Sequence, residues 1–414
     1  MSSIANATTL PKRAWLILGL LCIVGCLNYL DRMMITTMRS SIVAEIPMTD
    51  AQFGLLTSVF LWTYGLLSPF MGYLADRYNR SHIIIISLLV WSAVTWATGY
   101  ATSFNQLLAT RVLMGISEAC YLPAALALIV DYHRGATRSL ATGIHLAGIM
   151  IGQSLGFAGG WLAEQYDWTA AFTVFGAVGI FHSLVLLFFL RDRPGELAVV
   201  APEKKTLAFG STMQALFTNR NFNLLLVFYS VLAIVSWMTI GWLPTFYKEQ
   251  FDLSQTQAGL YATAYIHPMA LLGAILGGYL ADRYSRKNPR ARIMVPVTGL
   301  LLAAPFIFIA GLSTILPLTI ISFMFFSFTR VFADANLMPI LCQVVDEKHR
   351  SSGMGVINAC ACIVGGIGLY AGGILRDSNV DLGTMFQVAA LIMLLCIAAL
   401  YRINPRLEEA LKLK

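Results

Sequence analysis

Six charged residues lie inside long apolar stretches of this chain, where a charge must be either paired or functional. An ionised side chain at the centre of a membrane span costs about 3 kcal/mol or more. An arginine can bind a carboxylate or phosphate through two parallel hydrogen bonds, and an aspartate or glutamate can gain and lose a proton. These residue types could bind an anion and carry protons, or they could form static ion pairs that join helices. The six are Asp31, Arg32, Arg111, Glu118, Arg330 and Asp334.

The spacing of these charges predicts which of them share a helical face. Arg330 and Asp334 are four residues apart, a separation that permits a direct ion pair on a helix. Arg111 and Glu118 are seven residues apart. That separation is about two turns, or roughly 10 Å along the axis, so a pair between them needs a bridging group. Glu118 and Asp334 lie at similar distances in the sequence from the charged residue that ends each apolar stretch. The two carboxylates should therefore lie at nearly the same depth, near the membrane midplane.

Composition indicates that most of the chain faces lipid or other membrane spans. Of the 414 residues, 57% are hydrophobic and only 12% are charged, whereas a soluble domain carries roughly a quarter charged residues. Windows of about 20 apolar residues predict twelve transmembrane helices, so the fold class is an all-α membrane protein. The predicted spans cover residues 14–38, 51–74, 82–103, 105–130, 139–163, 168–190, 222–247, 257–281, 292–311, 315–340, 352–375 and 383–402.

The distribution of lysine and arginine predicts the orientation. Of the 28 such residues, 22 fall on the side that holds both termini, and three lie inside spans. Cytoplasmic loops carry an excess of these residues, so we expect a multi-pass protein of the cytoplasmic (inner) membrane with both termini in the cytoplasm. Basic loops beside anionic lipid account for the net charge of +7 without a nucleic acid partner. The opposite loops hold only Arg39, Lys248 and Arg376.

An internal repeat predicts two similar halves. The heptapeptide Gly-Tyr-Leu-Ala-Asp-Arg-Tyr occurs twice, 206 residues apart. The predicted domains are two pseudo-symmetric six-helix halves, 1–190 and 221–414, with a cytoplasmic linker at 191–220. Glycines in the fifth and eleventh spans should let neighbouring backbones approach closely. These are Gly156, Gly159, Gly160, Gly368, Gly372 and Gly373.

The charged residues of the repeat lie at the predicted cytoplasmic face, far from the midplane charges. We therefore predict that they form a gate and not a binding site. Their aspartates could pair with an arginine across the joint between the halves and hold an outward-open state. The predicted gating residues are Gly72, Asp76, Arg77, Arg80, Gly278, Asp282, Arg283 and Arg286.

The repeated pattern G-x-x-x-D-R-x-x-R, at 72–80 and 278–286, resembles the signature of the major facilitator superfamily. Residues 28–32, 111–119 and 241–245 resemble its anion:cation symporter branch and the related Spinster-like carriers. The resemblance covers the whole chain. It implies the major facilitator fold and a secondary active transporter that works by alternating access. The activity that it implies is proton-coupled symport of a small organic anion, such as a sugar acid or similar carboxylate.

One departure from a related pattern narrows the function. Drug–proton antiporters of this superfamily typically carry G-x8-G-P-x2-G in the fifth span, and Gln153 stands here in place of the proline. This argues against a multidrug exporter. An exporter or a lysolipid/sphingolipid-type carrier of the Spinster group, or a proton antiporter, remains the alternative, and sodium could replace protons as the coupling ion.

The chemistry of the midplane charges and their depth suggest roles for them. We expect Arg111 or Arg330 to bind the substrate anion, and Asp31 and Glu118 to carry the proton. Arg32 is a further anion ligand, although a static pair of Asp31 with Arg32 is the alternative. The predicted site comprises Tyr29, Arg32, Arg111, His145, Arg330 and Asn358 for the substrate, and Asp31, Glu118 and Asp334 for the proton.

His145 and Asn358 enter this set because they occupy corresponding positions in the two halves. His267 in the eighth span is a further candidate. A hydrogen-bonded packing role is the alternative for each histidine.

Other classes of function lack their motifs. The chain has no P-loop and no nucleophile elbow, so neither ATP-driven transport nor an enzyme is expected. Seven cysteines without paired CxxC motifs predict no metal site and no disulfide framework, and no cofactor is expected. A membrane receptor or sensor would need an added soluble domain, for which neither terminus is long enough. The expected partners are the substrate anion, protons and the lipid bilayer, and the expected state is a monomer.

Overall fold

The structure, a computed structural model, describes residues 12–133, 137–192 and 209–403. In these ranges all regular structure is helical, and twelve helical segments are long and apolar enough to cross a membrane. The predicted all-α fold with twelve spans is therefore confirmed. The first half contains α1 (Lys12–Thr37), α2 (Arg39–Glu45), α3 (Asp50–Arg77), α4 (Arg80–Thr98), α5 (Phe104–Glu118), α6 (Tyr121–Tyr132), α7 (Arg138–Ser154), α8 (Phe157–Gln165) and α9 (Trp168–Phe189).

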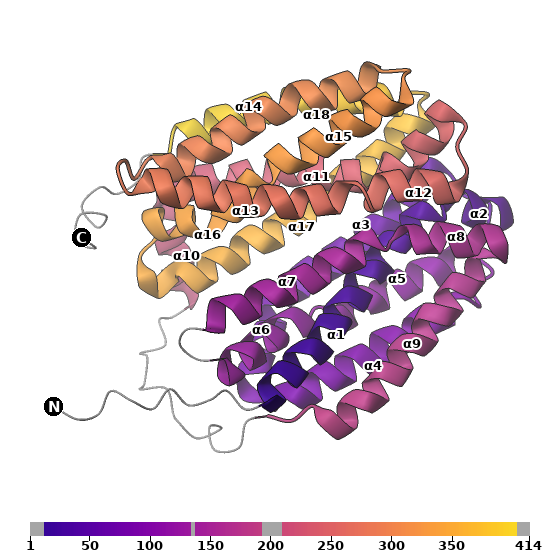
Figure 1. Cartoon of the computed structure of the whole chain (residues 1–414), viewed down its shortest axis with the longest axis horizontal. Helices are drawn as coiled ribbons and strands as arrows, with labels where there is room; N and C mark the ends of the chain where they lie inside the picture. Colours follow the sequence, from indigo (N-terminus) through magenta and orange to yellow (C-terminus); the bar gives the residue numbers. More distant parts are fainter. Residues whose placement is uncertain (1–11, 134–136, 193–208, 404–414) are drawn as a thin grey trace.

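The second half begins inside the stretch predicted as a linker, of which residues 193–208 lie outside the described ranges. It contains α10 (Phe209–Thr218), α11 (Arg220–Phe251), α12 (Gln255–Thr263), α13 (Ile266–Ser285), α14 (Ala291–Leu312), α15 (Leu316–Arg330), α16 (Phe332–Val344), the short 3-10 helix η2 (Glu347–His349), α17 (Arg350–Asp377) and α18 (Leu382–Tyr401). The short helix α10 packs against α11 at the end of the bundle where α1 begins and α18 ends, which we call the terminal end (Figure 1).

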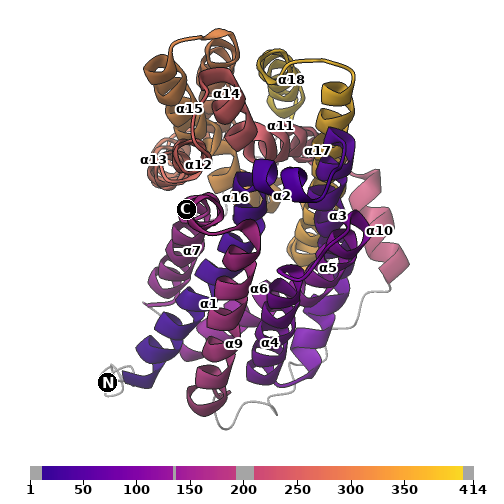
Figure 2. The same cartoon turned by 90° about the vertical axis from the view of Figure 1, so that its right-hand side faces the viewer.

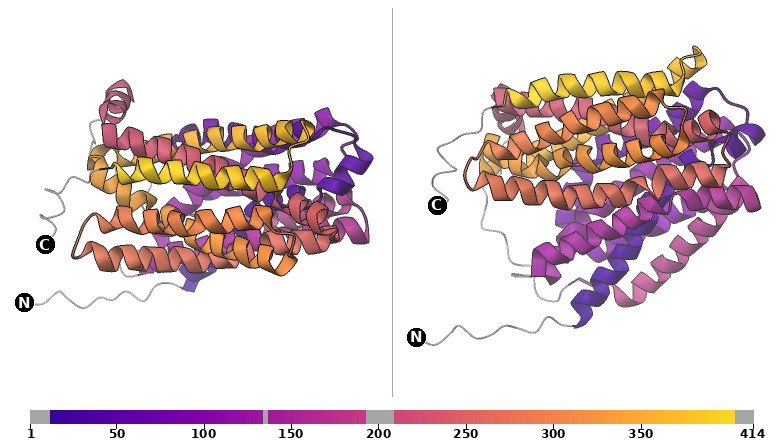
Figure 3. Two further views of the ribbon diagram at one scale, coloured as in Figure 1. Left: turned by 90° about the horizontal axis from the view of Figure 1, so that it is seen from above. Right: turned by 45° about the horizontal axis from the view of Figure 1, so that its top comes forward.

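The two halves lie close together at the end of the bundle that holds α2, and they diverge toward the terminal end (Figure 1). We call the first of these the α2 end. Figure 2 looks onto it and shows α3 beside α17, and α7 beside α13. The long helices run nearly side by side through the whole bundle (Figure 3).

Side chains cap the helices that begin at the α2 end. Ser103, Asp167 and Asp381 each accept a hydrogen bond from a backbone N–H in the first turn of the following helix, and Ser254 forms a full capping box with Gln257. Each such cap stabilises a helix by about 1 kcal/mol. These caps define where the chain turns back into the membrane.

Four of the spans are each built from two consecutive helices: α5–α6, α7–α8, α12–α13 and α15–α16. The first break has a local cause, because Pro123 has no N–H to donate to the carbonyl of Ala119. Glu118 is the last residue of α5, and Arg330 is the last residue of α15. The broken spans therefore place charged side chains where the helix is interrupted, which is tolerated where the backbone faces a cavity or other protein.

Glycines bring the halves together along two seams. A Cβ atom added to Gly373 of α17 would lie 2.3 Å from the Asp50 carbonyl oxygen of α3, and one added to Gly160 of α8 would lie 3.0 Å from the Gln255 carbonyl oxygen. Ser58 Oγ donates to the Gly366 carbonyl across the first seam at 2.6 Å. The prediction that glycine-rich spans allow close backbone approach is confirmed at these positions.

A similar contact within the first half gives a test of packing. A Cβ atom at Gly152 of α7 would lie 2.0 Å from the Cys26 carbonyl oxygen of α1, whereas one at Gly143 of the same helix would meet nothing within 4 Å. We expect Gly152→Ala to destabilise the protein by about 1–3 kcal/mol, since a packed backbone must shift. Gly143→Ala is the control and should leave the melting temperature in detergent unchanged. Equal melting temperatures for the two variants would contradict this packing.

Candidate functional site

An ion pair between α1 and α5 lies deep in the first half. Arg32 Nε donates to Glu118 Oε2 at 2.8 Å, and the two side chains are 5% and 0% exposed. The rings of Tyr29, Phe60 and Tyr64 surround the guanidinium, with centroids 4.6, 4.9 and 4.5 Å from its Cζ atom. The charge of Arg32 is therefore already balanced within the protein.

Asp31 is the chain neighbour of Arg32 but faces another helix. Its Oδ2 accepts a hydrogen bond from Thr95 Oγ1 of α4 at 3.1 Å, and its Oδ1 has no hydrogen-bond partner. Successive side chains on an α-helix point about 100° apart, so the two charges reach different neighbours. The alternative of a static pair between Asp31 and Arg32 is therefore wrong, because Arg32 pairs with Glu118 instead.

Arg111 of α5 is a buried cation with unused hydrogen-bond donors. Arg111 is 2% exposed, and its Nε and Nη2 atoms have no hydrogen-bond partner. The ring centroid of Phe172 lies 5.6 Å from its Cζ atom. Asp31 and Glu118 lie within electrostatic reach of it. An unpaired buried donor costs about 1–3 kcal/mol, and more when it is charged. An anion bound here would satisfy donors that the protein leaves free.

Two adjoining cavities lie between the halves. Arg32 and Arg111 line a narrow cavity of about 30 Å³. A larger cavity of about 290 Å³ adjoins it, and both are lined by Met33, Trp237 and Ile240. The lining of the larger one comes from α1 and α7 in the first half and from α11, α12, α13, α15 and α16 in the second. The larger volume is near the lower end of the roughly 300–1,000 Å³ typical of small-molecule sites.

Arg330 and Asp334 form an ion pair at the break between α15 and α16. Arg330 Nη1 and Nη2 donate to the two Asp334 oxygens at 2.9 and 3.2 Å, as the four-residue spacing predicts. The cation ends one helix and the carboxylate lies in the first turn of the next, which suits both helix dipoles. The two side chains are 17% and 44% exposed and line the larger cavity. This pair is accessible, unlike the pair in the first half.

The remaining predicted ligands divide into those on the cavity wall and those away from it. Tyr29 and His267 line the larger cavity. His145 is 0% exposed and lies inside the first half, with its Nε2 atom 3.5 Å from the Tyr121 hydroxyl. Asn358 is half-buried in α17 and lines neither cavity. His145 therefore packs inside the first half, and the assignment of His145 and Asn358 as substrate ligands stays a prediction.

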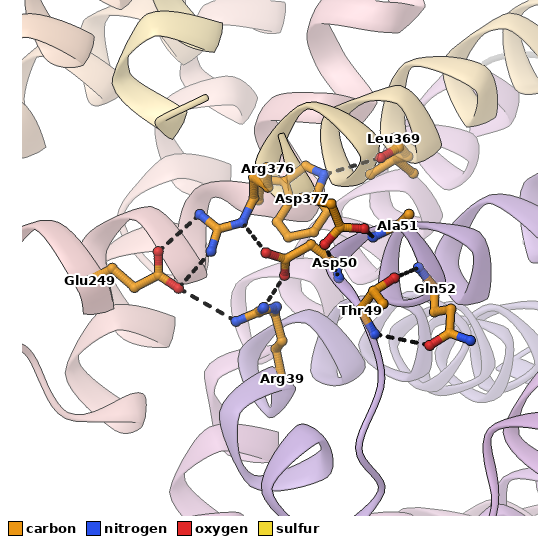
Figure 4. A network of polar contacts seen from close by, with 10 residues as sticks. Arg39, Thr49, Asp50, Ala51, Gln52, Glu249, Leu369, Arg376 and Asp377 are labelled. Carbon is orange, nitrogen blue, oxygen red and sulfur yellow. Dashed lines mark hydrogen bonds and ion pairs between the residues drawn. The ribbon is translucent and has the colours of Figure 1, made fainter. Parts of the chain in front are cut away.

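A charged network that sequence reasoning missed joins the halves at the α2 end (Figure 4). Arg376 of α17 donates to both carboxylate oxygens of Glu249 at 2.9 Å and to Asp50 of α3 at 3.0 Å. Arg39 of α2 pairs with Asp50 and lies 3.5 Å from Glu249. Each arginine thus binds one acid from its own half and one from the other.

A carboxylate cap strengthens the same junction. The Asp377 side chain accepts hydrogen bonds from the backbone N–H groups of Asp50 and Ala51 at 2.9 and 3.0 Å (Figure 4). A residue of the second half therefore caps the first turn of α3. The sequence carried a signal for this network, because Arg39 and Arg376 are two of only three basic residues in the loops on that side.

The repeated motif lies at the terminal end, and two of its charges pair with residues of their own half. Asp282 accepts from Arg292 Nη2 at 2.8 Å, and Arg80 pairs with Asp131. The surroundings of Gly72 and the side chain of Asp76 lie outside the described part of the structure. Exposed positions in the motif are occupied by Arg77, Arg283 and Arg286.

Comparisons with known proteins agree with this architecture. The model of the Major Facilitator Superfamily matches residues 21–296 and 230–414. The chain belongs to the major facilitator superfamily. It is a twelve-span secondary transporter and not an enzyme, and its predicted likeness to the Spinster group is confirmed.

Two relatives show how far the similarity extends along the chain. Protein spinster homolog 1 of Homo sapiens is 30% identical over 319 residues, which cover 72% of this chain and 60% of that protein. A probable sulfoacetate transporter of Cupriavidus necator is 27% identical over 423 residues, covering 96% of this chain and 95% of the relative. A crystal structure of a bacterial homolog to the human lysosomal transporter Spinster, inward-facing and unoccupied, has the same fold, with a TM-score of 0.76, 23% identity and 95% coverage of each chain.

The two ion pairs should differ sharply in their contribution to stability. Glu118→Ala leaves the enclosed Arg32 without a counter-charge, and such losses cost about 3–5 kcal/mol. Asp334→Ala removes the partner of a half-exposed pair that contributes about 0–1 kcal/mol. We expect a large fall in the melting temperature for the first variant and little change for the second. Similar melting temperatures would show that Arg32 is not held as described.

Proposed function

We propose that this transporter carries a small organic anion, a sugar acid or a similar carboxylate, across the cytoplasmic membrane together with protons. The observation that carries the proposal is Arg111, which lines a cavity between the halves and whose buried Nε and Nη2 donors have no partner. An arginine fork is suited to a carboxylate or sulfonate. Arg32 is a fixed counter-ion in this proposal and not a substrate ligand, since Glu118 and three rings already hold it.

The same geometry offers a route to proton coupling. Arg111 lies within electrostatic reach of Asp31 and Glu118. When an anion binds Arg111, it neutralises a cation that favours the ionised form of both carboxylates, so each holds a proton more readily. Substrate binding and proton uptake then promote each other. The relative that is a probable sulfoacetate transporter, matched over nearly the whole chain, supports an organic anion as the substrate.

Alternating access gives the network at the α2 end a role. With the termini in the cytoplasm, this end faces outward, and the structure corresponds to a state that opens toward the cytoplasm. The pairs of Arg39 and Arg376 with Asp50 and Glu249 hold that state closed on the outside. In the opposite state, Asp282 would exchange Arg292 for an arginine across the joint, as expected of a cytoplasmic gate.

A lipid-type carrier of the Spinster group is the second candidate. The larger cavity has an apolar wall on the side of the second half, with Trp237, Leu243, Phe323 and Phe326. This wall would suit an acyl chain, and the likeness to protein spinster homolog 1 supports it. A thermal-shift comparison of the purified protein with sugar acids and with lysolipids separates the two candidates.

The anion site predicts that Arg111→Gln affects substrate binding much more than it affects stability. The variant should lose binding and uptake of the substrate anion, because the fork that holds the carboxylate is gone. Its melting temperature should fall less than that of Glu118→Ala, since Arg111 has no direct ion-pair partner to leave unpaired. Binding and melting curves on the same preparation provide the measurement. Full uptake by this variant would rule out Arg111 as the anion ligand.

Coupling is tested with Asp31→Asn and Glu118→Gln in proteoliposomes. Both variants should lose accumulation driven by a proton gradient, while exchange of substrate across the membrane without a gradient continues. Asp381→Asn is the control, because this carboxylate caps α18 outside the membrane span. Accumulation should not depend on sodium. If both variants kept full proton-driven accumulation, the assignment of the coupling residues would be wrong.

The closure at the α2 end is tested by spin labels at Ala44 and Gln250, two exposed positions in opposite halves, after replacement of the seven native cysteines. Arg376→Gln removes two ion pairs and should broaden the distance distribution toward longer distances. Arg292→Gln breaks a pair within one half at the other end and serves as the matched control. An unchanged distribution in Arg376→Gln would exclude the network as a gate.

A further inference from the structure

Among the Ser and Thr side chains that line the larger cavity, one hydroxyl has no hydrogen-bond partner in the described part of the structure. Three Ser or Thr residues line this cavity. Ser236 donates to the Leu232 carbonyl at 2.9 Å, and Ser327 donates to the Ile266 carbonyl at 3.0 Å. Thr239 of α11 is 4% exposed, and its Oγ1 atom has no hydrogen-bond partner. A hydroxyl in the middle of a helix normally bonds to the preceding turn, so the free Thr239 hydroxyl needs another partner.

Two more polar residues with spare hydrogen-bonding capacity line the same cavity. Arg330 uses Nη1 and Nη2 for Asp334, which leaves its buried Nε atom without a partner. Asp334 is 44% exposed and can accept further hydrogen bonds. The cavity wall therefore offers a donor on Arg330, an acceptor on Asp334 and the Thr239 hydroxyl, which can act as either.

We propose that Thr239, Arg330 and Asp334 form a second subsite that binds the hydroxyl groups of the substrate, while Arg111 binds its carboxylate. This inference rests on the proposed function and names the substrate class as a polyhydroxylated monoanion. A hydroxyl both donates and accepts, which matches a donor beside an acceptor. A second anionic group would meet the Asp334 charge, and an alkyl chain would leave the Thr239 hydroxyl and Arg330 Nε without partners.

Position supports a two-part site. The narrow cavity with Arg111 and the larger cavity with this subsite share the lining residues Met33, Trp237 and Ile240. Arg111 belongs to the first half and the subsite to the second. A substrate that contacts both would be held from both halves, as expected for a carrier whose site lies at their interface.

Three ligands with the same six-carbon skeleton test the inference: gluconate, hexanoate and adipate. Binding is measured by calorimetry with the full-length protein in lipid nanodiscs. We expect gluconate to bind at least tenfold more tightly than either analogue. Thr239→Val, which keeps the shape of the side chain, should weaken gluconate binding about tenfold, the value of one hydrogen bond. It should leave the weak binding of hexanoate unchanged, and Asp334→Asn should improve the binding of adipate.

The chain provides a matched control in Thr245→Val. Thr245 also lies on α11, is 4% exposed and has a free Oγ1 atom, but it lines a different cavity at the α2 end. This variant should bind gluconate like the native protein. The subsite is overturned if gluconate fails to bind, binds no better than hexanoate, or loses equal affinity in the two threonine variants. The proposed function fails separately if Arg111→Gln weakens the binding of none of the three ligands.

Discussion

The ion pair between Arg32 and Glu118 determines how the other charges of the first half are arranged. It joins α1 to α5 inside a shell of aromatic rings, where neither charge can be left alone. Arg32 binds Glu118 Oε2, while Nε and Nη2 of Arg111 on the same helix as Glu118 have no hydrogen-bond partner. Asp31, turned toward α4, balances the total charge without a direct contact to either arginine. The pair thus leaves one cation electrostatically compensated but free to bind.

Equivalent helix breaks in the two halves place charged side chains in different surroundings. Glu118 ends α5 and is sealed from solvent, whereas Arg330 ends α15 and faces the larger cavity. The first half therefore holds a rigid, buried charge cluster, and the second half presents an accessible one. A sealed cluster keeps its proton equilibria away from bulk water, and an accessible pair can exchange partners with a ligand. The sequence repeat produced similar backbones, and the side chains at the breaks made them unequal.

Local patterns in the sequence were sufficient for part of this structure. Twelve apolar stretches predict twelve spans, since span length follows from membrane thickness, and the four-residue spacing predicts the pair of Arg330 with Asp334. The pair of Arg32 with Glu118 joins residues 86 positions apart, and that of Arg39 with Glu249 joins residues 210 positions apart. No periodicity carries such information, because these contacts depend on which helices become neighbours. Thr239 was missed for a related reason: a threonine in an apolar span normally bonds to its own helix, and only tertiary packing reveals that it does not.

Ion pairs that would separate when the halves move are weaker than the pair that lies inside one half. At the α2 end the paired side chains are between 14% and 46% exposed, and pairs in contact with water contribute about 0–1 kcal/mol each. A few such pairs can hold two halves together and still separate at a cost that ligand binding can offset, since a bound ligand shifts an equilibrium by its differential affinity for the two states. The buried pair of Arg32 and Glu118 is different, because separating it would strand a charge at a cost of about 3–5 kcal/mol. Its place inside one half, and not across the joint, allows the halves to move while the charge cluster stays intact.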